Sequence, residues 1–471
     1  MPLPYFLFPE VIPLFSYMNR GRDFYRDVFS LALPIILQNL IASSMGFLDT
    51  FMVGLLGEGP MAAVTLANIP VFVIQLTTFG LQSGASVLIS QYYGKGDNDA
   101  INRVLGIGLY AAGGLTLLFG CVMFFIPEQF MGLFGNDPAV IALSARYARI
   151  VAFCYFFSST TQVYLAAHWS MANPKLGLYV LTVPMVCNTF FNWVFIFGKL
   201  GFPAMGVEGA ALATLLSCVL QFVIVVVHAF VSRGFRLKPA LIFRPGREMA
   251  RRYVRYAAPV VLNEALWGFG NSLYPTIMGH MEGSQAILAA HGLSGNIVNL
   301  ASVMAFGVAG SVAIIVGREI GAGRKDTVYE VGLCLDTLAF LTGLVTGLAA
   351  IAVTFLVLRP YLYPLFDLSP EAGNIATTML MVTFSTLSLR TFNSANVVGV
   401  LRGGGDVRMA SVIDLSPLWL VAVPLAALSG LVFRWGILAV QISIAMENVV
   451  KFFLGVARLR SGAWIRDVTV S

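Results

Sequence analysis

One carboxylate stands inside the first long apolar stretch of the chain. Asp49 lies within residues 41–70, IASSMGFLDTFMVGLLGEGPMAAVTLANIP, where most neighbours are apolar. An ionised Asp at membrane depth is costly unless it faces a polar interior or accepts a proton. Asp49 is therefore a candidate for binding and releasing a cation. The alternative is an Asp that only hydrogen-bonds neighbouring helices.

Two amides and a hydroxyl in later apolar runs supply further oxygen atoms. Asn188 and Asn192 are four residues apart in the fifth run, so they share one helix face. Thr214 lies about two turns into the sixth run. With Asp49 these residues form an oxygen-rich set that could hold Na⁺ or share a proton. The alternative is interhelical hydrogen bonding, which is common for Asn and Thr in membrane bundles.

A second polar level is predicted from two pairs, Gln38-Asn39 and Asn263-Glu264. Only Glu264 is charged, which suits a cavity that binds organic cations. Trp267, three residues on, shares its helix face and could stack on a planar ligand by a cation–π contact. Glu264 could instead only hydrogen-bond a neighbouring helix. The remaining intramembrane acids are secondary candidates that could pair with polar groups between helices: Asp336, Asp414 and Glu447.

The composition places these residues in a membrane protein. Of 471 residues, 58% are hydrophobic and 11% charged, whereas a soluble domain carries roughly 25% charged residues. The net charge of +6 belongs to loops, so it indicates orientation and not nucleic-acid binding. The fold class is all-α, with about twelve transmembrane helices expected at 27–54, 62–91, 100–126, 138–167, 177–198, 207–231, 256–279, 286–317, 328–357, 371–398, 408–430 and 435–457.

Enzyme motifs are missing from the sequence. There is no H-E-x-x-H, Walker A or G-x-S-x-G pattern, so we expect no enzyme, no cofactor and no ATP hydrolysis. The five cysteines lack metal-ligand spacing, and no metal is expected beyond Na⁺ at the Asp49 set. Active transport would therefore draw on an ion gradient.

Basic residues indicate the orientation. Alternate connections carry most Lys and Arg residues, and the segment 233–255 holds eight of them. By the positive-inside rule both termini and this linker are cytoplasmic, in a multi-pass protein of the cytoplasmic (inner) membrane. The predicted parts are a tail (1–26), an N-lobe (27–231), a basic linker (232–255), a C-lobe (256–457) and a C-terminal tail (458–471).

The two lobes contain an internal repeat. Pro34-Ile-Ile-Leu-Gln38-Asn39 matches Pro259-Val-Val-Leu-Asn263-Glu264, and further matches follow in the same order. Each half has about six helices, so both start on the same side of the membrane. This is a parallel repeat, related by an axis along the membrane normal, and it is typical of transporters with a cavity between halves.

Several motifs together resemble the multidrug and toxin extrusion (MATE) transporters. They are Asp49-Thr-Phe-Met-Val-Gly54, the Gly94-Lys-Gly96 and Gly321-Ala-Gly323 loops, Asn188 with Asn192, Gly206-Val-Glu-Gly-Ala-Ala-Leu-Ala-Thr214 and Leu401-Arg-Gly-Gly-Gly-Asp406. The resemblance implies two six-helix lobes in a V shape. It also implies that Asp49, Asn188, Asn192 and Thr214 match the family's first-lobe cation site. Past its first residue, Glu371, helix ten has Arg390 and no acid, which departs from the sodium-coupled branch.

The function expected from these features is multidrug efflux by an H⁺- or Na⁺-coupled antiporter of amphipathic, often cationic, compounds. The expected partners are those compounds, the coupling ion and the lipid bilayer, and we expect a monomer. The runner-up is a flippase for a lipid-linked precursor, which would need a basic cavity for phosphate. A channel is less favoured, because the sequence shows no ring of identical charges.

Overall fold

The computed structural model of the chain describes residues 16–134, 137–232, 235–365 and 369–470. These residues form helices and connecting turns, and no strand occurs among them. Residues 1–15 of the predicted N-terminal tail, residues 233–234 of the predicted linker and Ser471 of the predicted C-terminal tail lie outside the described part of the chain. The chain divides into two compact units, residues 34–265 and residues 1–33 with 266–471.

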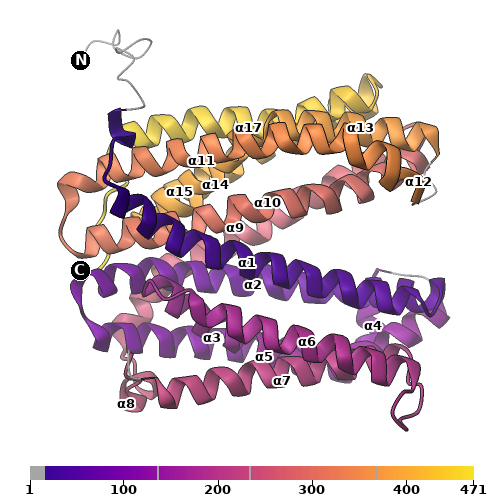
Figure 1. The fold of residues 1–471 in the computed structure, drawn as a ribbon, viewed down its shortest axis with the longest axis horizontal. Coiled ribbons are helices and arrows are strands. Elements are labelled where there is room, and N and C mark those ends of the chain that lie inside the picture. The colour runs from indigo at the N-terminus through magenta and orange to yellow at the C-terminus, as the bar shows by residue number, and fades with distance from the viewer. Residues whose placement is uncertain (1–15, 135–136, 233–234, 366–368, 471) are drawn as a thin grey trace. The chain divides into compact units, whose positions relative to one another are not determined.

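The unit 34–265 contains a set of long α-helices. It begins within α1 (Arg22–Gly54) and continues through α2 (Glu58–Lys95), α3 (Asn98–Phe125), α5 (Pro138–Ser170), α6 (Lys175–Phe197) and α7 (Val207–Val231). Two short helices, α4 (Pro127–Met131) and α8 (Pro239–Phe243), lie between them. Figure 1 shows α3, α5, α6 and α7 side by side, and α5 packs against α2, α3 and α7.

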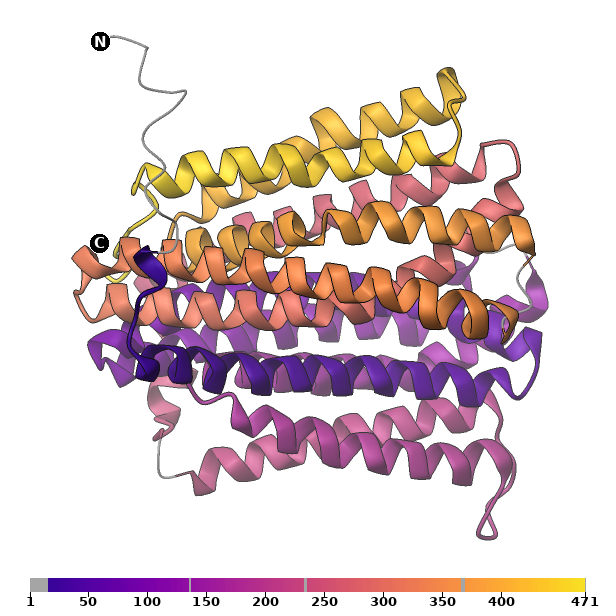
Figure 2. The ribbon, with the colours of Figure 1, turned by 45° about the horizontal axis from the view of Figure 1, so that its top comes forward.

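The other unit holds α10 (Ser284–Gly321), α11 (Lys325–Val353) and α17 (Ile437–Arg460) as long helices. Between α11 and α17, stretches of π-helix alternate with stretches of α-helix. The order is η2 (Thr354–Leu362), α12 (Tyr363–Leu365), α13 (Pro370–Ser385), α14 (Leu387–Ser394), η3 (Ala395–Leu401), α15 (Val407–Pro417), η4 (Leu418–Ala422), α16 (Val423–Ala427) and η5 (Leu428–Val432). In Figure 2 the yellow α17 runs beside the gold segment that contains α16, against which it packs.

The helices account for the membrane-spanning character expected from the sequence. Among the described residues, ten helices are long and apolar enough to cross a membrane. The pair α13 and α14–η3, bent by 52°, gives an eleventh. The remaining long helix of the described residues, α9 (Arg247–Gly279), is less apolar, because it begins with basic residues and carries Asn263, Glu264 and Asn271 in its middle. The observed ends lie within five residues of the predicted ones everywhere except at the start of α9.

The start of α9 differs from the sequence prediction. Residues 247–255, expected in the basic linker, form its first turns. Tyr253 is 2% exposed and its hydroxyl donates to the carbonyl of Leu81 at 2.9 Å. Gly84 of α2 lies so close to Ala257 that an added Cβ would come within 2.4 Å of its Cα. This packing places the first half of α9 in the unit 34–265, so the unit boundary falls inside α1 and α9 and not in the linker.

The segment after α17, predicted as a tail, packs against its own unit. Trp464 is fully buried and its Nε1 donates to the carbonyl of Leu459 at 3.0 Å. The backbone nitrogen of Arg466 donates to the carbonyl of Gly404 at 2.8 Å. The Arg458 guanidinium donates to buried Asp406 at 2.7 Å. The C-terminal segment therefore anchors the loop between η3 and α15.

Candidate functional site

Asp49 of α1 is held by amides of α6. The Nδ2 of Asn192 donates to Oδ1 of Asp49 at 2.5 Å and to Oδ1 of Asn188 at 3.2 Å. Both asparagines are 0% exposed, whereas Asp49 is half-buried. The i, i+4 spacing places both amides on the same face of α6. The structure thus brings together three of the four residues predicted from the sequence for cation binding.

One of the amide atoms left over at this site, the Oδ1 of Asn192, suits a small cation. The Oδ1 of Asn192 and the Nδ2 of Asn188 are buried and have no hydrogen-bond partner within the described residues. A buried polar atom without a partner carries a desolvation cost that a ligand or water can remove. Carboxylate and amide oxygens are ligands that hard cations prefer. The donor set therefore fits Na⁺ or a shared proton, with Asp49 as the charged member.

Thr214, the fourth predicted residue, lies on α7 and is joined to the site through a tyrosine. Its hydroxyl donates to the carbonyl of Ala210 at 3.0 Å and also interacts with Tyr147. Tyr147 of α5 is 7% exposed and lies within electrostatic reach of Asp49. Sequence reasoning missed Tyr147, since no motif or spacing distinguishes it from the other tyrosines of the chain.

Gln38, predicted to contact substrate, is built into the packing of its unit. It is 1% exposed, and its Nε2 donates to the carbonyl of Pro174 at 2.7 Å. A Cβ at Gly177 would lie 1.9 Å from its Oε1, so the glycine makes room for the amide. Gln38 therefore connects α1 to the start of α6. Its neighbour Asn39 is half-buried.

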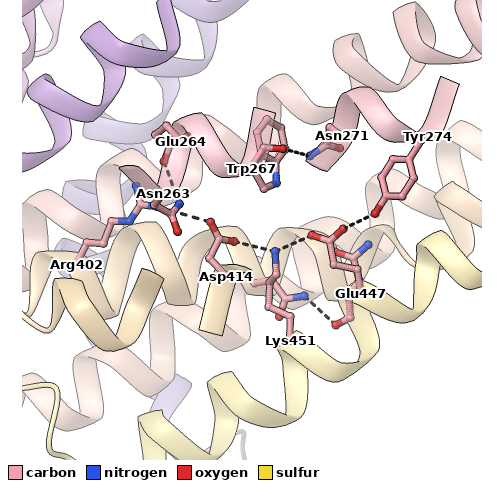
Figure 3. Close-up of polar contacts among 11 residues, drawn as sticks. Asn263, Glu264, Trp267, Asn271, Tyr274, Arg402, Asp414, Glu447 and Lys451 are labelled. Carbon is pink, nitrogen blue, oxygen red and sulfur yellow. Dashed lines mark hydrogen bonds and ion pairs between the residues drawn. The ribbon is translucent and has the colours of Figure 1, made fainter. Parts of the chain in front are cut away.

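The other predicted substrate residues lie on α9. Asn263 and Glu264 are both buried, and the Asn263 Nδ2 lies 3.5 Å from Glu264 Oε1. Trp267 is half-buried, and its carbonyl accepts from Asn271 Nδ2 at 2.8 Å (Figure 3). The spacing keeps Glu264 and Trp267 on one face of a continuous helix.

Two secondary candidates, Asp414 of α15 and Glu447 of α17, meet at a buried lysine. The Lys451 ammonium donates to Asp414 Oδ1 at 2.7 Å and to Glu447 Oε1 at 2.8 Å. The Tyr274 hydroxyl donates to Glu447 Oε2 at 3.2 Å, and Arg402 lies 3.7 Å from Asp414 Oδ2. We call these five residues the C-terminal ion network. Figure 3 shows Lys451 between the two carboxylates.

The basic members of this network were not foreseen from the sequence. Arg402, in the motif Leu401-Arg-Gly-Gly-Gly-Asp406, is 1% exposed. Lys451 is 5% exposed. The available signal was the i, i+4 pair Glu447 and Lys451 inside an apolar run, which pairs opposite charges on one helix face.

Asp336, the third secondary candidate, is bound by an amide and lies outside the network. The Asn396 Nδ2 donates to its Oδ2 at 2.7 Å, and both residues are buried. Asn396 comes from the π-helical segment η3, which packs against α11. Within the described residues no group of three or more His, Cys, Asp or Glu side chains is placed to hold a metal.

Comparisons with known proteins identify relatives over nearly the whole chain. The sequence model of the MatE family matches residues 34–194 and 259–428. The "Uncharacterized transporter YisQ" of Bacillus subtilis is 26% identical over 95% of this chain and 97% of its own length. The "Probable multidrug resistance protein NorM" of Thermotoga maritima is 24% identical over 98% of this chain and 96% of its own.

A solved structure shows the same fold. It is a MOP superfamily transporter from Pyrococcus furiosus, with a TM-score of 0.83 and 21% sequence identity. The match covers 97% of this chain and 100% of that chain. The two stretches matched by the family model begin at Pro34 and Pro259, the two prolines paired in the predicted internal repeat.

Proposed function

Because the chain belongs to the MATE (MatE) family of membrane transporters, which are not enzymes, we propose that it is a cation-coupled exporter of amphipathic, often cationic, organic compounds. The observation that supports cation coupling is the carboxylate of Asp49, which accepts a hydrogen bond from Asn192 at 2.5 Å. Asn192 in turn donates to Asn188 at 3.2 Å. The chain's multidrug resistance relatives support drug-like compounds as the cargo.

The geometry supports a simple exchange at Asp49. The amide of Asn192 holds the carboxylate in place, with Asn188 behind it, and neither amide neutralises its charge, so H⁺ or Na⁺ can supply the missing positive charge. A membrane-embedded Asp is stable when neutralised and costly when bare. Loading and release of one cation would therefore change the energy of this site in each transport cycle, which can be coupled to opening on alternate sides of the membrane.

We propose that substrate contacts come from the second set of polar residues predicted from the sequence. Glu264 supplies a carboxylate for cationic compounds, with Asn39 and Asn263 as hydrogen-bonding groups and Trp267 as an aromatic surface. Gln38 is better explained as a packing residue, because its amide is buried and bonded to Pro174.

The proposal includes orientation and domain organisation. Both termini and the linker would lie in the cytoplasm, following the basic connections. The two six-helix lobes would be 27–231 and 256–457, each starting on the cytoplasmic side. Labelling of single cysteines introduced at Lys199 and at Arg236 with a membrane-impermeant maleimide tests this. We expect only the first to react from outside intact cells.

Drug transport into proteoliposomes, with the pH and Na⁺ gradients imposed separately, tests the coupling. We expect one of the two gradients to drive uptake of a fluorescent cationic compound against its own gradient. Transport that proceeds equally with neither gradient would contradict coupling and favour a passive pore. Movement of a lipid-linked phosphate without movement of the compound would favour the flippase alternative.

A further inference from the structure

The first turns of α9 carry three arginines without a counter-charge. Arg247, Arg251 and Arg255 follow one another at intervals of four residues, so they lie on roughly one face of the helix. All three are exposed, and none forms a side-chain hydrogen bond or ion pair with another residue that the structure describes. Like charges four residues apart on a helix repel one another. An anion bound from outside the chain would relieve this repulsion.

The acids near these turns are bound elsewhere. Residues 235–255 contain seven basic residues and one acid, Glu248. Glu248 pairs with Arg252 at 3.2 Å. Asp97, which precedes α3, accepts from the backbone nitrogen of Ala100 at 2.9 Å and caps that helix. These carboxylates therefore do not balance the three arginines.

The linker in front of the arginines is fixed against α3. The Lys238 ammonium pairs with Asp99, and the Lys238 backbone nitrogen donates to Oδ1 of buried Asn102 at 2.9 Å. The Arg103 guanidinium donates to the carbonyl of Pro245 at 3.1 Å, and α8 packs against α3 as well. The start of α9 is thus held in place, and Asp99 already has its partner.

The arginine face continues along α9 as an exposed apolar face. Val254, Ala258 and Leu262 follow at the same spacing, and Val254 and Leu262 are 57% and 60% exposed. Ala258 and Leu262 belong to the predicted span 256–279. The face is therefore basic where the predicted span begins and apolar within the span. This order matches a phospholipid, with its phosphate beside the arginines and its acyl chains beside the apolar side chains.

We propose that Arg247, Arg251 and Arg255 bind the phosphate groups of anionic phospholipids. A guanidinium offers two parallel N–H donors that match two phosphate oxygens. A soluble phosphate or an acidic protein would neutralise the arginines but leave the adjoining apolar face uncovered, which favours a lipid. Lipid bound here would fix the depth of α9 in the bilayer. This inference goes beyond the proposed export function, because it assigns a lipid partner and no cargo.

Native mass spectrometry of the purified protein in detergent tests the assignment. The probes are phosphatidylglycerol and phosphatidylcholine with the same palmitoyl and oleoyl chains, titrated separately. We expect the wild type to prefer phosphatidylglycerol. The double variant Arg251→Gln with Arg255→Gln should weaken its binding about tenfold or more and leave phosphatidylcholine within about twofold, since each basic residue contributes about fivefold at an anionic lipid surface. An unchanged preference in this variant overturns the proposal.

The matched control is Arg408→Gln with Arg460→Gln. Both residues are exposed and lack a side-chain hydrogen bond or ion pair among the described residues. They lie at the start of α15 and the end of α17, so the control removes the same charge from other helices. Its preference for phosphatidylglycerol should stay within about twofold of the wild type. An equal loss in both double variants would assign the effect to net charge and overturn the proposal.

A single variant and two competitors complete the test. If the double variant does not fold, Arg251→Gln alone should lower the preference about fivefold, and an unchanged preference there overturns the proposal. Glycerol 3-phosphate and hexaglutamate at tenfold excess over lipid should not displace phosphatidylglycerol. Displacement by the first would assign the face to soluble phosphates, and by the second to an acidic protein. Either result overturns the lipid assignment.

Discussion

The Asp49 site in one half of the chain and the Asp414–Glu447 pair in the other are neutralised in different ways, although Asp336 of the second half is, like Asp49, bound by an amide. In residues 34–265, Asp49 is held by neutral amides, Asn192 directly and Asn188 behind it. In residues 266–471, Asp414 and Glu447 are held by Lys451, a cation of the chain itself. The first arrangement leaves a carboxylate whose counter-ion must come from outside. In the second arrangement the counter-ion is a side chain of the protein, Lys451, so it cannot be exchanged for an ion from solution.

The helices that carry these sites differ as well. The described part of the first half consists of α-helices, whereas the second half contains the π-helical segments η2 to η5. The extra residue of a π-turn breaks the regular hydrogen-bond ladder, and such turns are frequent at functional sites. η3 carries Asn396, the partner of Asp336, and η4 directly follows the helix that carries Asp414. The repeat therefore conserves helix order while local winding and charge have diverged.

Asp49→Asn should have the largest effect, because it removes the charge of the proposed cation-coupling site. We expect coupled export in proteoliposomes to fall to background while the protein remains folded and membrane-inserted. The matched control is Glu208→Gln, since Glu208 forms a partly exposed pair with Arg146 that contributes little. Full gradient-driven transport by Asp49→Asn at normal protein levels would assign Asp49 a packing role only.

Lys451→Met should affect stability more than any single change in the first site. It leaves Asp414 and Glu447 buried without their shared cation, and removing one partner of a buried pair typically costs about 3–5 kcal/mol. Thermal unfolding in detergent, followed by tryptophan fluorescence, should show a marked loss. Lys199→Met, at an exposed loop, should unfold like the wild type.

The double change Lys451→Met with Glu447→Gln sharpens this prediction. Removing one of the two uncompensated carboxylates should recover part of the lost stability, because fewer buried charges remain unpaired. If the double variant is less stable than Lys451→Met by the full cost of Glu447→Gln measured alone, the two residues do not compensate one another. The network would then be a set of independent contacts.

Glu264→Gln should change the preference for charge and not the overall capacity to bind. We expect binding of a cationic compound to weaken about tenfold relative to its neutral analogue, the scale of one lost charge contact. Trp267→Ala should weaken planar compounds, since it removes a stacking surface from the same helix face. An unchanged ratio in Glu264→Gln would indicate that Glu264 only hydrogen-bonds within the protein.

The sequence predicted the helices well because membrane spans obey a strong constraint. Every backbone polar group must be satisfied within the span, so an apolar run of the right length forms a helix. The exception, the start of α9, shows the limit of this reasoning. Residues 247–255 are basic and resemble a linker, but Tyr253 and Ala257 pack against α2 and make this segment helical. Such packing depends on residues far apart in the sequence.

Part of the candidate site was also predictable from the sequence. Asp49, Asn188 and Asn192 were identifiable because polar residues in apolar runs are conspicuous, and i, i+4 spacing fixes their common face. The partner of each acid was not predictable, since it depends on which helices meet. Asp414 and Glu447 therefore had no predicted counter-ion, and Tyr147 had no signal at all. The burial of Arg402 was not predictable either, because a loop motif does not reveal which side chains are buried.

Thr214→Val should have the smallest effect on transport, and it tests whether Thr214 belongs to the cation site. The valine keeps the shape of the side chain and removes only the hydroxyl, which donates to Ala210 and interacts with Tyr147. One hydrogen-bonding group typically contributes about 0.5–1.5 kcal/mol, so the coupling-ion concentration for half-maximal transport should rise roughly threefold to tenfold. The maximal rate should be nearly unchanged, because Asp49 keeps its charge and its bond to Asn192.

Thr189→Val is the matched control for this change. Thr189 lies on α6 beside Asn188, and its hydroxyl likewise donates to a backbone carbonyl one turn earlier, that of Met185 at 3.1 Å. A loss of backbone hydrogen bonding alone would affect both variants equally. A shift in ion dependence confined to Thr214→Val would place Thr214 and Tyr147 in the cation site with Asp49. Equal behaviour of the two variants would restrict that site to Asp49, Asn188 and Asn192, the residues already joined by hydrogen bonds.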